Sequence, residues 1–315
     1  MQEFVPGSNI FAIDALYYEP QIASIHLLRE GDRIAIIDTG TQFSAPQVTA
    51  ALHKLGLNHQ HVDLIILTHI HLDHAGGAGT LMQQCPNAQL VVHKKGARHM
   101  AHPEKLIAGA TAVYGEQGFQ NLYGEVTPID EQRMLQPEDE AILDFAGRPL
   151  QFIDSPGHAS HHHCIIDQQS NSIFTGDTLG VGYRALRNDE HAFVAATTTP
   201  VQFNPVALHK SIDRVMSYEP EHLYLTHYSH VTPSARIVAG LHEQIDDFVA
   251  LTEQAAEAGD AFEAQLASLL HDYLVRRCLN ELPGLDPETA KHWLKLDADL
   301  NAQGLAFWWQ YRRAA

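Results

Sequence analysis

The sequence is poor in cysteine and in basic residues. Its 315 residues include three cysteines, and 20 Lys and Arg stand against 38 Asp and Glu, which gives a formal net charge of −18. Cys85, Cys164 and Cys278 are widely spaced and odd in number, so they form neither a disulfide framework nor a thiolate zinc knuckle, and we expect reduced thiols in a cytoplasmic protein. Because phosphate backbones are bound by clustered Lys and Arg, the acidic balance argues against a nucleic-acid partner.

Long apolar runs are also missing. The run at 64–67, LIIL, is far too short to cross a bilayer. The first twenty residues have no basic region followed by an apolar core, so we expect neither a membrane partner nor a secretory signal. The sequence does contain 45% apolar residues and 22 histidines. It can therefore bury a large core, which excludes a disordered or fibrous class.

The first part of the sequence has the pattern of a mixed α/β domain. Residues 24–38 read as two strands around a Glu-Gly-Asp turn, and a helix is expected from about Pro46 to the stop at Gly56. Short apolar runs between turn residues predict further strands at 63–68, 89–93, 150–154, 163–167, 172–177 and 223–226. The stretch 205–218 has apolar residues on one helical face. We therefore predict one domain over residues 1–232.

The remainder, residues 233–315, has a helical composition. Ala, Leu, Glu and Gln dominate 234–258 and 260–280, and a break at Leu-Pro-Gly precedes a last helical stretch that contains three tryptophans. This extension is expected to be a lid, a dimer surface or packing against the core. In the lid hypothesis, Trp308 or Trp309 caps the substrate pocket.

The strongest chemical signal is Thr68-His69-Ile70-His71-Leu72-Asp73-His74, directly after the apolar run DLIIL and before two glycines. Imidazole nitrogens and carboxylate oxygens suit zinc, iron or manganese. Alternate residues of an extended loop point to the same side, so His69 and His71 can share one ion while Asp73 and His74 turn toward another. The segment predicts two adjacent metal ions.

Three later segments also place a polar residue just after an apolar strand. They are Ser-Pro-Gly-His ending at His158, Phe-Thr-Gly-Asp-Thr around Asp177, and Leu-Tyr-Leu-Thr-His ending at His227. Each one is weak by itself, because a single His or Asp at a strand end is usually just solvated. Together with the first motif they form a specific constellation.

This constellation resembles the metallo-β-lactamase superfamily, whose hallmark is HxHxDH followed by a distant His, an Asp and a His. The resemblance covers roughly residues 10–230 and is greatest for the glyoxalase II-like and lactonase-like branches. It implies an α/β fold, an αββα sandwich of two mixed β-sheets flanked by helices, here with a C-terminal helical extension. The ligands that it implies are His69, His71 and His158 for one ion, Asp73, His74 and His227 for a second, and Asp177 bridging both.

The resemblance further implies a reaction. Two divalent ions, zinc first with iron or manganese as alternatives, can share a water and lower its pKa from about 16 toward neutrality. The resulting hydroxide would attack an ester, thioester or lactone of a small molecule, and Asp73 would orient it and take its proton. The glyoxalase II continuation Gly-Cys-Gly-Arg is absent after Asp177, which puts that particular activity in doubt.

Several alternatives remain open. A mononuclear-iron sulfur dioxygenase shares HxHxDH, and the fold also serves regulatory or ligand-binding members with residual hydrolase activity. His230 is an alternative to His227 as the last ligand. Tyr183 and Tyr228 are candidates to hydrogen-bond a substrate carbonyl, with simple packing as their other interpretation. A homodimer is compatible with the sequence.

Overall fold

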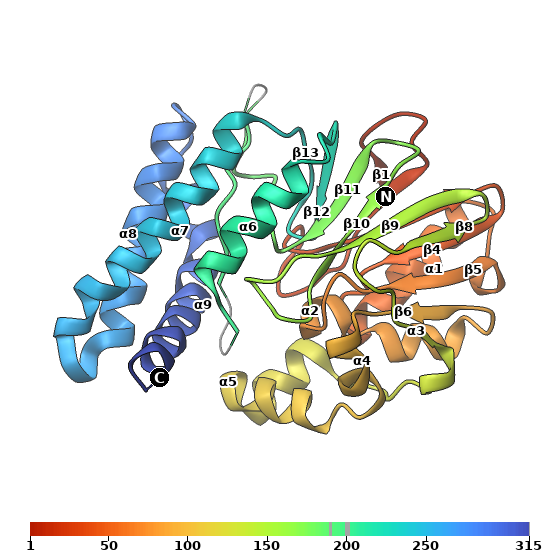
Figure 1. Ribbon diagram of the computed structural model, residues 1–315, viewed down its shortest axis with the longest axis horizontal. Helices are drawn as coiled ribbons and strands as arrows, with labels where there is room; N and C mark the ends of the chain where they lie inside the picture. Colours follow the sequence, from red (N-terminus) through yellow and green to blue (C-terminus); the bar gives the residue numbers. More distant parts are fainter. Residues whose placement is uncertain (189–190, 199–201, 315) are drawn as a thin grey trace. The chain divides into compact units, whose positions relative to one another are not determined.

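The chain forms two compact units, each assembled from separate stretches of sequence. The computed structural model describes residues 1–188, 191–198 and 202–314 (Figure 1). Unit 1 comprises Met1–Asp154, His161–Gly176 and His222–His230, and unit 2 comprises Ser155–Ser160, Asp177–Glu221 and Val231–Ala315. The division of the chain after residue 232 stays a prediction.

A mixed seven-stranded sheet makes up the first layer of unit 1. Its strands follow one another in chain order: β1 (Gln2–Glu3), β2 (Ile10–Asp14), β3 (Ser24–Glu30), β4 (Arg33–Ile37), β5 (Val62–Ile66), β6 (Gln89–Val91) and β7 (Met134–Leu135). The pairs from β1 to β4 are antiparallel, and the pairs from β4 to β7 are parallel. The β3–β4 hairpin matches the turn expected at Glu-Gly-Asp.

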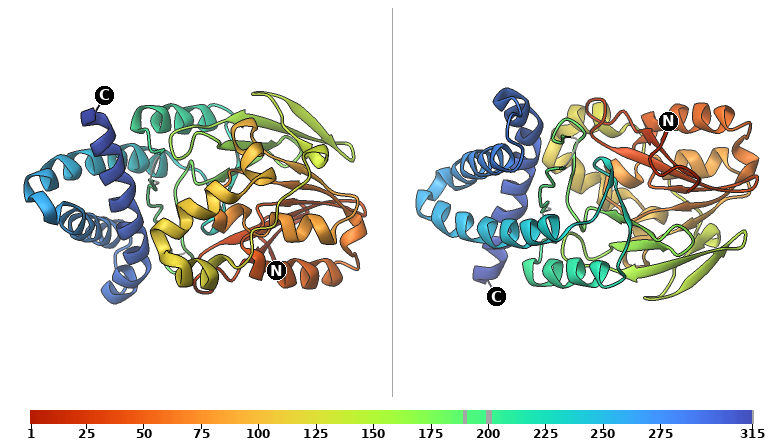
Figure 2. Two further views of the ribbon diagram at one scale, coloured as in Figure 1. Left: turned by 90° about the horizontal axis from the view of Figure 1, so that it is seen from below. Right: turned by 90° about the horizontal axis from the view of Figure 1, so that it is seen from above.

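A mixed six-stranded sheet lies face to face with the first (Figure 2). Its order is β13 (Ser229–Val231), β12 (His222–Leu225), β11 (Ser172–Gly176), β10 (His163–Asp167), β9 (Arg148–Asp154) and β8 (Ile142–Phe145). The strands β11 and β12 pair in parallel, whereas the pairs from β11 to β8 are antiparallel. These strands include all four that the sequence predicts in this region.

The main core fills the space between the two sheets. Ile37, Ile66 and Val91 of the seven-stranded sheet share one buried cluster with Phe152 and Phe174 of the six-stranded sheet. Full burial of Phe-sized side chains contributes about 1.5–3 kcal/mol each to the stability of the fold. The sheets are therefore held by apolar packing, which leaves the strand ends available for polar side chains.

Helices cover the outer face of the seven-stranded sheet. They are α1 (Ala45–Lys54), α2 (Leu72–Ala75), α3 (Ala78–Gln84), α4 (Lys94–Ala101) and α5 (Glu104–Tyr123). Side chains alternate across a strand, and Ile36, Ile65 and Leu90 on that outer face are fully buried. In α1, Val48 and Leu52 supply part of the apolar cover. The helix predicted near Pro46 is thus present and performs this packing role.

Unit 2 contains the remaining helices: α6 (Pro205–Met216), α7 (Ala235–Ala255), α8 (Phe262–Glu281) and α9 (Pro287–Ala314). Each of the helices that the sequence predicts after residue 204 is present. The segment between Asp177 and Glu221 is tied to them by hydrogen bonds, from the Thr198 N–H to Asn301 Oδ1 (2.7 Å) and from the Ala196 N–H to Gln244 Oε1 (2.9 Å). No helix among the described residues is both long and apolar enough to cross a membrane.

Two tryptophans of α9 contact the same segment. The ring of Trp293 lies 5.3 Å from that of Tyr183, and Trp308 meets Phe203 edge-on at 6.1 Å. Both contacts lie within unit 2. The hypothesis that Trp308 or Trp309 caps a substrate pocket stays a prediction.

A buried histidine in the core predicts sensitivity to acid. Burial lowers the pKa of His26 to about 4, and its ring packs against Phe174 and Tyr224. The unfolded chain binds a proton below its ordinary pKa near 6.5, whereas the folded chain resists it down to about 4, so stability falls as the pH drops through this window. At about 1.4 kcal/mol per pKa unit, the shifted pKa of His26 should lower the free energy of unfolding by roughly 2–3 kcal/mol between pH 7 and 4.5.

Urea unfolding at these two pH values measures the effect. A His26→Gln variant should lose less stability on acidification than the parent protein, whereas a variant at the exposed His102 should lose as much as the parent. Equal acid losses for His26→Gln and the parent would contradict the assignment.

Candidate metal centre

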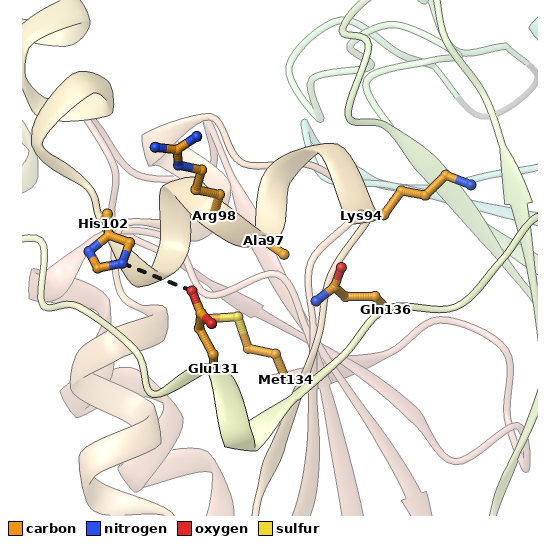
Figure 3. Close-up of a pocket in the computed structure, with 7 residues that line it drawn as sticks. All are labelled: Lys94, Ala97, Arg98, His102, Glu131, Met134 and Gln136. Carbon is orange, nitrogen blue, oxygen red and sulfur yellow. Dashed lines mark ion pairs between the residues drawn. The ribbon is translucent and has the colours of Figure 1, made fainter.

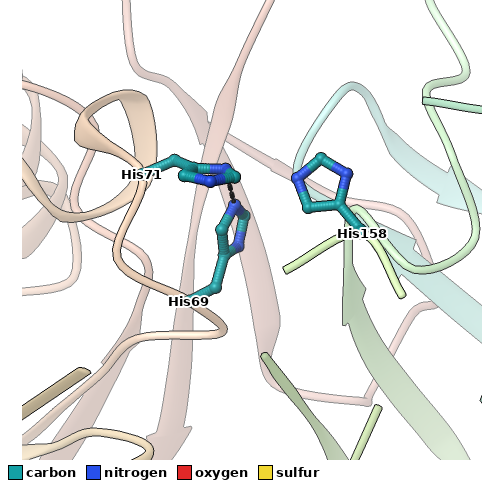
Figure 4. A group of neighbouring side chains, drawn as sticks. All are labelled: His69, His71 and His158. Carbon is teal, nitrogen blue, oxygen red and sulfur yellow. Dashed lines mark hydrogen bonds between the residues drawn. The ribbon is translucent and has the colours of Figure 1, made fainter. Parts of the chain in front are cut away.

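The HxHxDH segment begins three residues after the end of β5 and ends in the short helix α2. His69 Nε2 and His71 Nδ1 lie 2.7 Å apart, and the two rings stand edge to face (Figure 4). The ring of His74 lies 4.0 Å from that of His69. His69 and His74 are buried and His71 is partly exposed. The loop therefore directs several imidazole nitrogens toward one region at the end of the sheet.

Three of the predicted ligands form a compact triangle within unit 1. His227 Nε2 lies 3.3 Å from Asp73 Oδ2 and 3.3 Å from His74 Nε2, and His74 Nε2 lies 3.7 Å from Asp73 Oδ2. Ligand atoms at about 2.0–2.1 Å from a tetrahedral zinc ion lie about 3.3 Å from one another. The spacing of the three atoms therefore fits a single divalent ion.

In both imidazoles of this triangle, the Nδ1 atom, which is not one of the triangle atoms, is held by an oxygen. His74 Nδ1 donates to Asp38 Oδ2 at 2.9 Å, and His227 Nδ1 donates to the carbonyl of Ile22 at 2.9 Å. A proton on Nδ1 leaves the lone pair on Nε2, which is the tautomer that a metal ligand needs. The surroundings thus prepare both Nε2 atoms to bind a cation.

Asp38 is a site residue that sequence reasoning missed. It is completely buried and accepts hydrogen bonds from the Thr68 N–H (2.8 Å), the Thr68 hydroxyl (2.9 Å) and the Thr226 hydroxyl (2.7 Å). It follows strand β4 directly, so it has the same position after an apolar strand as the predicted ligands. That position was the signal that could have identified it.

Two further predicted ligands belong to unit 2 and lie close to each other. His158 Nε2 and Asp177 Oδ2 are 3.4 Å apart, and both side chains are buried. In the sequence, His158 follows β9 by four residues and Asp177 follows β11 directly. The structure brings these two residues together, as it brings together the five predicted ligands of unit 1.

Other histidines near the motif contact a predicted ligand, the backbone or another histidine. The His162 ring stacks on that of His69 with centroids 4.9 Å apart, and His163 Nε2 lies 2.8 Å from the Leu67 carbonyl. Burial lowers the pKa of His163 to about 4, so this ring is neutral at ordinary pH and donates to that carbonyl. His230 pairs with His222 at 3.1 Å, whereas it is His227 that lies in the triangle.

The two tyrosines proposed from the sequence are both buried. The Tyr183 hydroxyl donates to Asp297 Oδ1 at 3.1 Å within unit 2, a contact that agrees with the packing interpretation of this residue. Tyr228 follows His227 and is 5% exposed. Their action on a substrate carbonyl stays a prediction.

A tyrosine cluster near Asp73 was not foreseen. The hydroxyls of Tyr17 and Tyr123 lie 3.1 Å apart, and the rings of Tyr114 and Tyr123 meet edge-on at 5.7 Å. Burial first, and then the nearby Asp73 carboxylate, raise the pKa of Tyr17 well above its ordinary value. Burial also raises the pKa of Tyr123, with further contributions from Tyr17 and Asp73, so both groups remain protonated donors.

A surface pocket of about 340 Å³ lies beside α4, also in unit 1. Lys94, Arg98 and His102 line it, with Glu131 and Met134 facing them (Figure 3). The helix starts next to the metal-ligand loop, because a Cβ atom at Gly96 would lie 2.7 Å from Ile70 Cγ2. Lys94 and Arg98 give this pocket two basic side chains, while Glu131 pairs with His102 at 3.9 Å.

Known proteins share both the sequence pattern and the fold of this chain. The profile of the metallo-beta-lactamase superfamily matches residues 18–245. The metallo-beta-lactamase fold-containing protein ST1585 of Sulfurisphaera tokodaii is 26% identical over 218 residues, which cover 68% of this chain and 76% of that protein. Its crystal structure gives a TM-score of 0.62 at 24% identity, over 76% of this chain and 86% of that one.

Other relatives have thioesterase names. Thioesterase pkgB of Emericella nidulans is 28% identical over 58% of this chain and 45% of its own length, and acyl-coenzyme A thioesterase MBLAC2 of Gallus gallus is 27% identical over 55% and 64%.

The structure of the family protein TTHA1429 from Thermus thermophilus covers 99% of this chain and 96% of its own, at 19% identity and a TM-score of 0.61. These structural likenesses confirm the predicted fold class.

Proposed function

The chain belongs to the metallo-beta-lactamase superfamily, and from its side-chain geometry we propose that it is a dinuclear metal-dependent hydrolase of a small-molecule ester, thioester or lactone. The observation that carries this proposal is the triangle of Asp73, His74 and His227, whose ligand atoms are 3.3–3.7 Å apart. The oxygens behind the two imidazoles support it, because such partners set the tautomer of a metal-ligating histidine.

Imidazole and carboxylate donors suit divalent ions, and we propose that two are bound, with zinc as our first choice. His69, His71 and His158 would hold one, the triangle would hold the other, and Asp177 would contact both, in the order that the superfamily resemblance implies. When bound, such ions lower the pKa of water toward neutrality and polarise a carbonyl. Imidazole and carboxylate donors also accept iron and manganese.

The protein's own groups would move the proton and hold the substrate. Asp73 is about one-fifth exposed, so water can reach its carboxylate, which can then accept a proton. The hydroxyls of Tyr17 and Tyr123 stay protonated because burial and Asp73 raise their pKa. One of the two hydroxyls donates to the other, and the second can donate a hydrogen bond to an oxygen of the bound substrate near Asp73.

The names of the relatives and the pocket beside α4 favour a thioester with an anionic carrier. Arg98 is exposed on the pocket rim, and Lys94 lines the same pocket with its ammonium in contact with Glu138 at 2.5 Å. A guanidinium fits a phosphate by two parallel hydrogen bonds. We propose that this rim binds the phosphate groups of a coenzyme A-like leaving group.

Removal of Arg98 should weaken the binding of the carrier. We expect Arg98→Ala to raise KM for acetyl-coenzyme A roughly three- to tenfold, since a hydrogen bond to a charged group contributes about 1.5–3 kcal/mol and an exposed site reduces this value. The N-acetylcysteamine thioester, which lacks phosphates, is the matched substrate, and its KM should be unchanged. Equal changes for both substrates would contradict phosphate recognition at Arg98.

The proposed function itself is tested with the full chain after removal of metal by a chelator. Reloading with zinc, manganese or iron should restore hydrolysis of at least one compound in a panel of p-nitrophenyl esters, acyl thioesters and lactones. Absence of metal-dependent turnover across the panel would reject the hydrolase. Oxygen consumption with a persulfide substrate in the iron-loaded protein alone would instead favour the mononuclear-iron sulfur dioxygenase.

A further inference from the structure

A second cluster of histidines and carboxylates lies in unit 2, on helices α6 and α7. The rings of His209 and His242 stack with centroids 4.9 Å apart and an interplanar angle of 10°. Their Nδ1 atoms face each other at 2.6 Å. None of the predicted ligands of the superfamily constellation belongs to this cluster.

Each of the two rings also faces a carboxylate on the opposite helix. His209 Nε2 lies 3.2 Å from Asp246 Oδ1, and His242 Nε2 lies 3.1 Å from Asp213 Oδ1. The sequence produces this arrangement twice, since His209 and Asp213 are four residues apart on α6, as are His242 and Asp246 on α7. Residues four apart lie on one helix face, so the two helices present matching His-Asp pairs to each other.

If both histidines are neutral, the cluster has too few protons to satisfy the contacts of all four ring nitrogens. Each Nε2 must carry a proton to donate to its carboxylate, and a neutral imidazole has only one such proton. Both Nδ1 atoms would then direct lone pairs at each other across 2.6 Å, which is repulsive. A cation bound between the two Nδ1 atoms would remove this repulsion between the lone pairs.

We propose that His209 and His242 form a second metal site that binds one divalent ion of the zinc, nickel or copper class through their Nδ1 atoms. Imidazole is a preferred ligand of these ions, and the carboxylates behind the rings fix the required tautomer. Two carboxylates and one divalent ion also leave the cluster without net charge. Both histidine side chains are 26% exposed, so an ion can reach them and water can complete its coordination.

The geometry requires only a small adjustment. Two nitrogens bound to a tetrahedral zinc ion lie about 3.3 Å apart, compared with 2.6 Å between the Nδ1 atoms in the structure. A slight rotation of the two side chains provides this separation. The bound ion would connect α6 to α7 and so stabilise unit 2 in proportion to its occupancy.

Equilibrium dialysis of the chelator-treated full chain against micromolar zinc tests the site without reference to activity. The parent protein should bind one more zinc ion per chain than the His209→Gln/His242→Gln variant. Asp213→Ala should weaken the affinity of this additional ion about tenfold, because loss of a carboxylate behind a ligand typically costs 10–100-fold. His271→Gln, at a partly exposed histidine whose ring bonds the Lys291 carbonyl, is the matched control and should bind as the parent does.

Equal zinc stoichiometry in the parent and the double variant would overturn the proposal, and this is the result expected if the histidine pair holds only a proton. Loss of one zinc ion in the control variant as well would also overturn it. If the double variant does not fold, modification of the parent protein by diethylpyrocarbonate decides the question. Zinc should slow modification of His209 and His242 several-fold, and no protection would reject the site. Because the readouts are ion counts and reaction with these two residues, they are independent of whether the hydrolase proposal holds.

Discussion

We expect Asp73→Asn to lower kcat/KM for the best substrate of the panel by about 10²–10⁴-fold, the range attributed to a positioned general base. The physical reason is the loss of a negative oxygen that lies 3.3 Å from His227 Nε2 and 3.7 Å from His74 Nε2. An amide at this position keeps the size of the side chain but cannot accept a proton from water. Steady-state kinetics on the zinc-reloaded protein measure the effect.

The controls for this variant separate chemistry from folding. Asp73 is about one-fifth exposed and Asn has the same size, so the circular dichroism spectrum of the metal-free variant should match that of the parent and its melting temperature should be close to it. Asp32→Asn, in the exposed turn of the β3–β4 hairpin, removes the same charge away from the site and should leave kcat/KM unchanged. Retention of full activity in Asp73→Asn would reject the proposed role of its carboxylate.

The position of polar residues after apolar strands proved more informative than the histidine content. The chain has 22 histidines, yet the triangle is formed by residues that follow β5 and β12, and these were identified by their place in the sequence. Strand β5 belongs to the seven-stranded sheet and β12 to the six-stranded sheet, so the contact between Asp73 and His227 depends on how the two sheets pack on each other. Their role as metal ligands stays a prediction.

Parts of the fold lacked a readable sequence signal. The helix α5 contains Gly115 with φ of +72° and few buried side chains, so its apolar spacing is weak. The edge strand β8 has two exposed residues among its four and is paired on one side only. Such elements are formed by tertiary contacts, which local patterns do not encode.

The supporting residues of the site were missed for a related reason. Tyr17 and Tyr123 are 106 positions apart, and only folding brings their hydroxyls to 3.1 Å. Asp38 ends an expected strand, but a carboxylate at a strand end is usually solvated. Its burial and its contact with His74 depend on how three strand ends meet, which no single segment specifies.

Asp38 is the position where we expect the largest loss of stability. Its carboxylate accepts bonds from Thr68 after β5 and Thr226 after β12, and it also holds the His74 imidazole. It therefore connects the ends of both sheets. In Asp38→Ala these buried donors lose their acceptor at about 1–3 kcal/mol each, so the free energy of unfolding of the metal-free protein should fall by about 3–5 kcal/mol.

The same carboxylate should also affect metal affinity. Asp38→Asn keeps one of the two acceptor oxygens but removes the charge behind His74, so we expect a smaller loss of stability and a roughly 10–100-fold weaker zinc affinity of the triangle. Urea unfolding of the metal-free variants and zinc titration against a competing chelator measure the two effects separately. If Asp38→Asn bound zinc as tightly as the parent, the His74 imidazole would not depend on Asp38 for its orientation. Unchanged unfolding of Asp38→Ala would likewise show that the bonds to Thr68 and Thr226 do not hold the two sheet ends together.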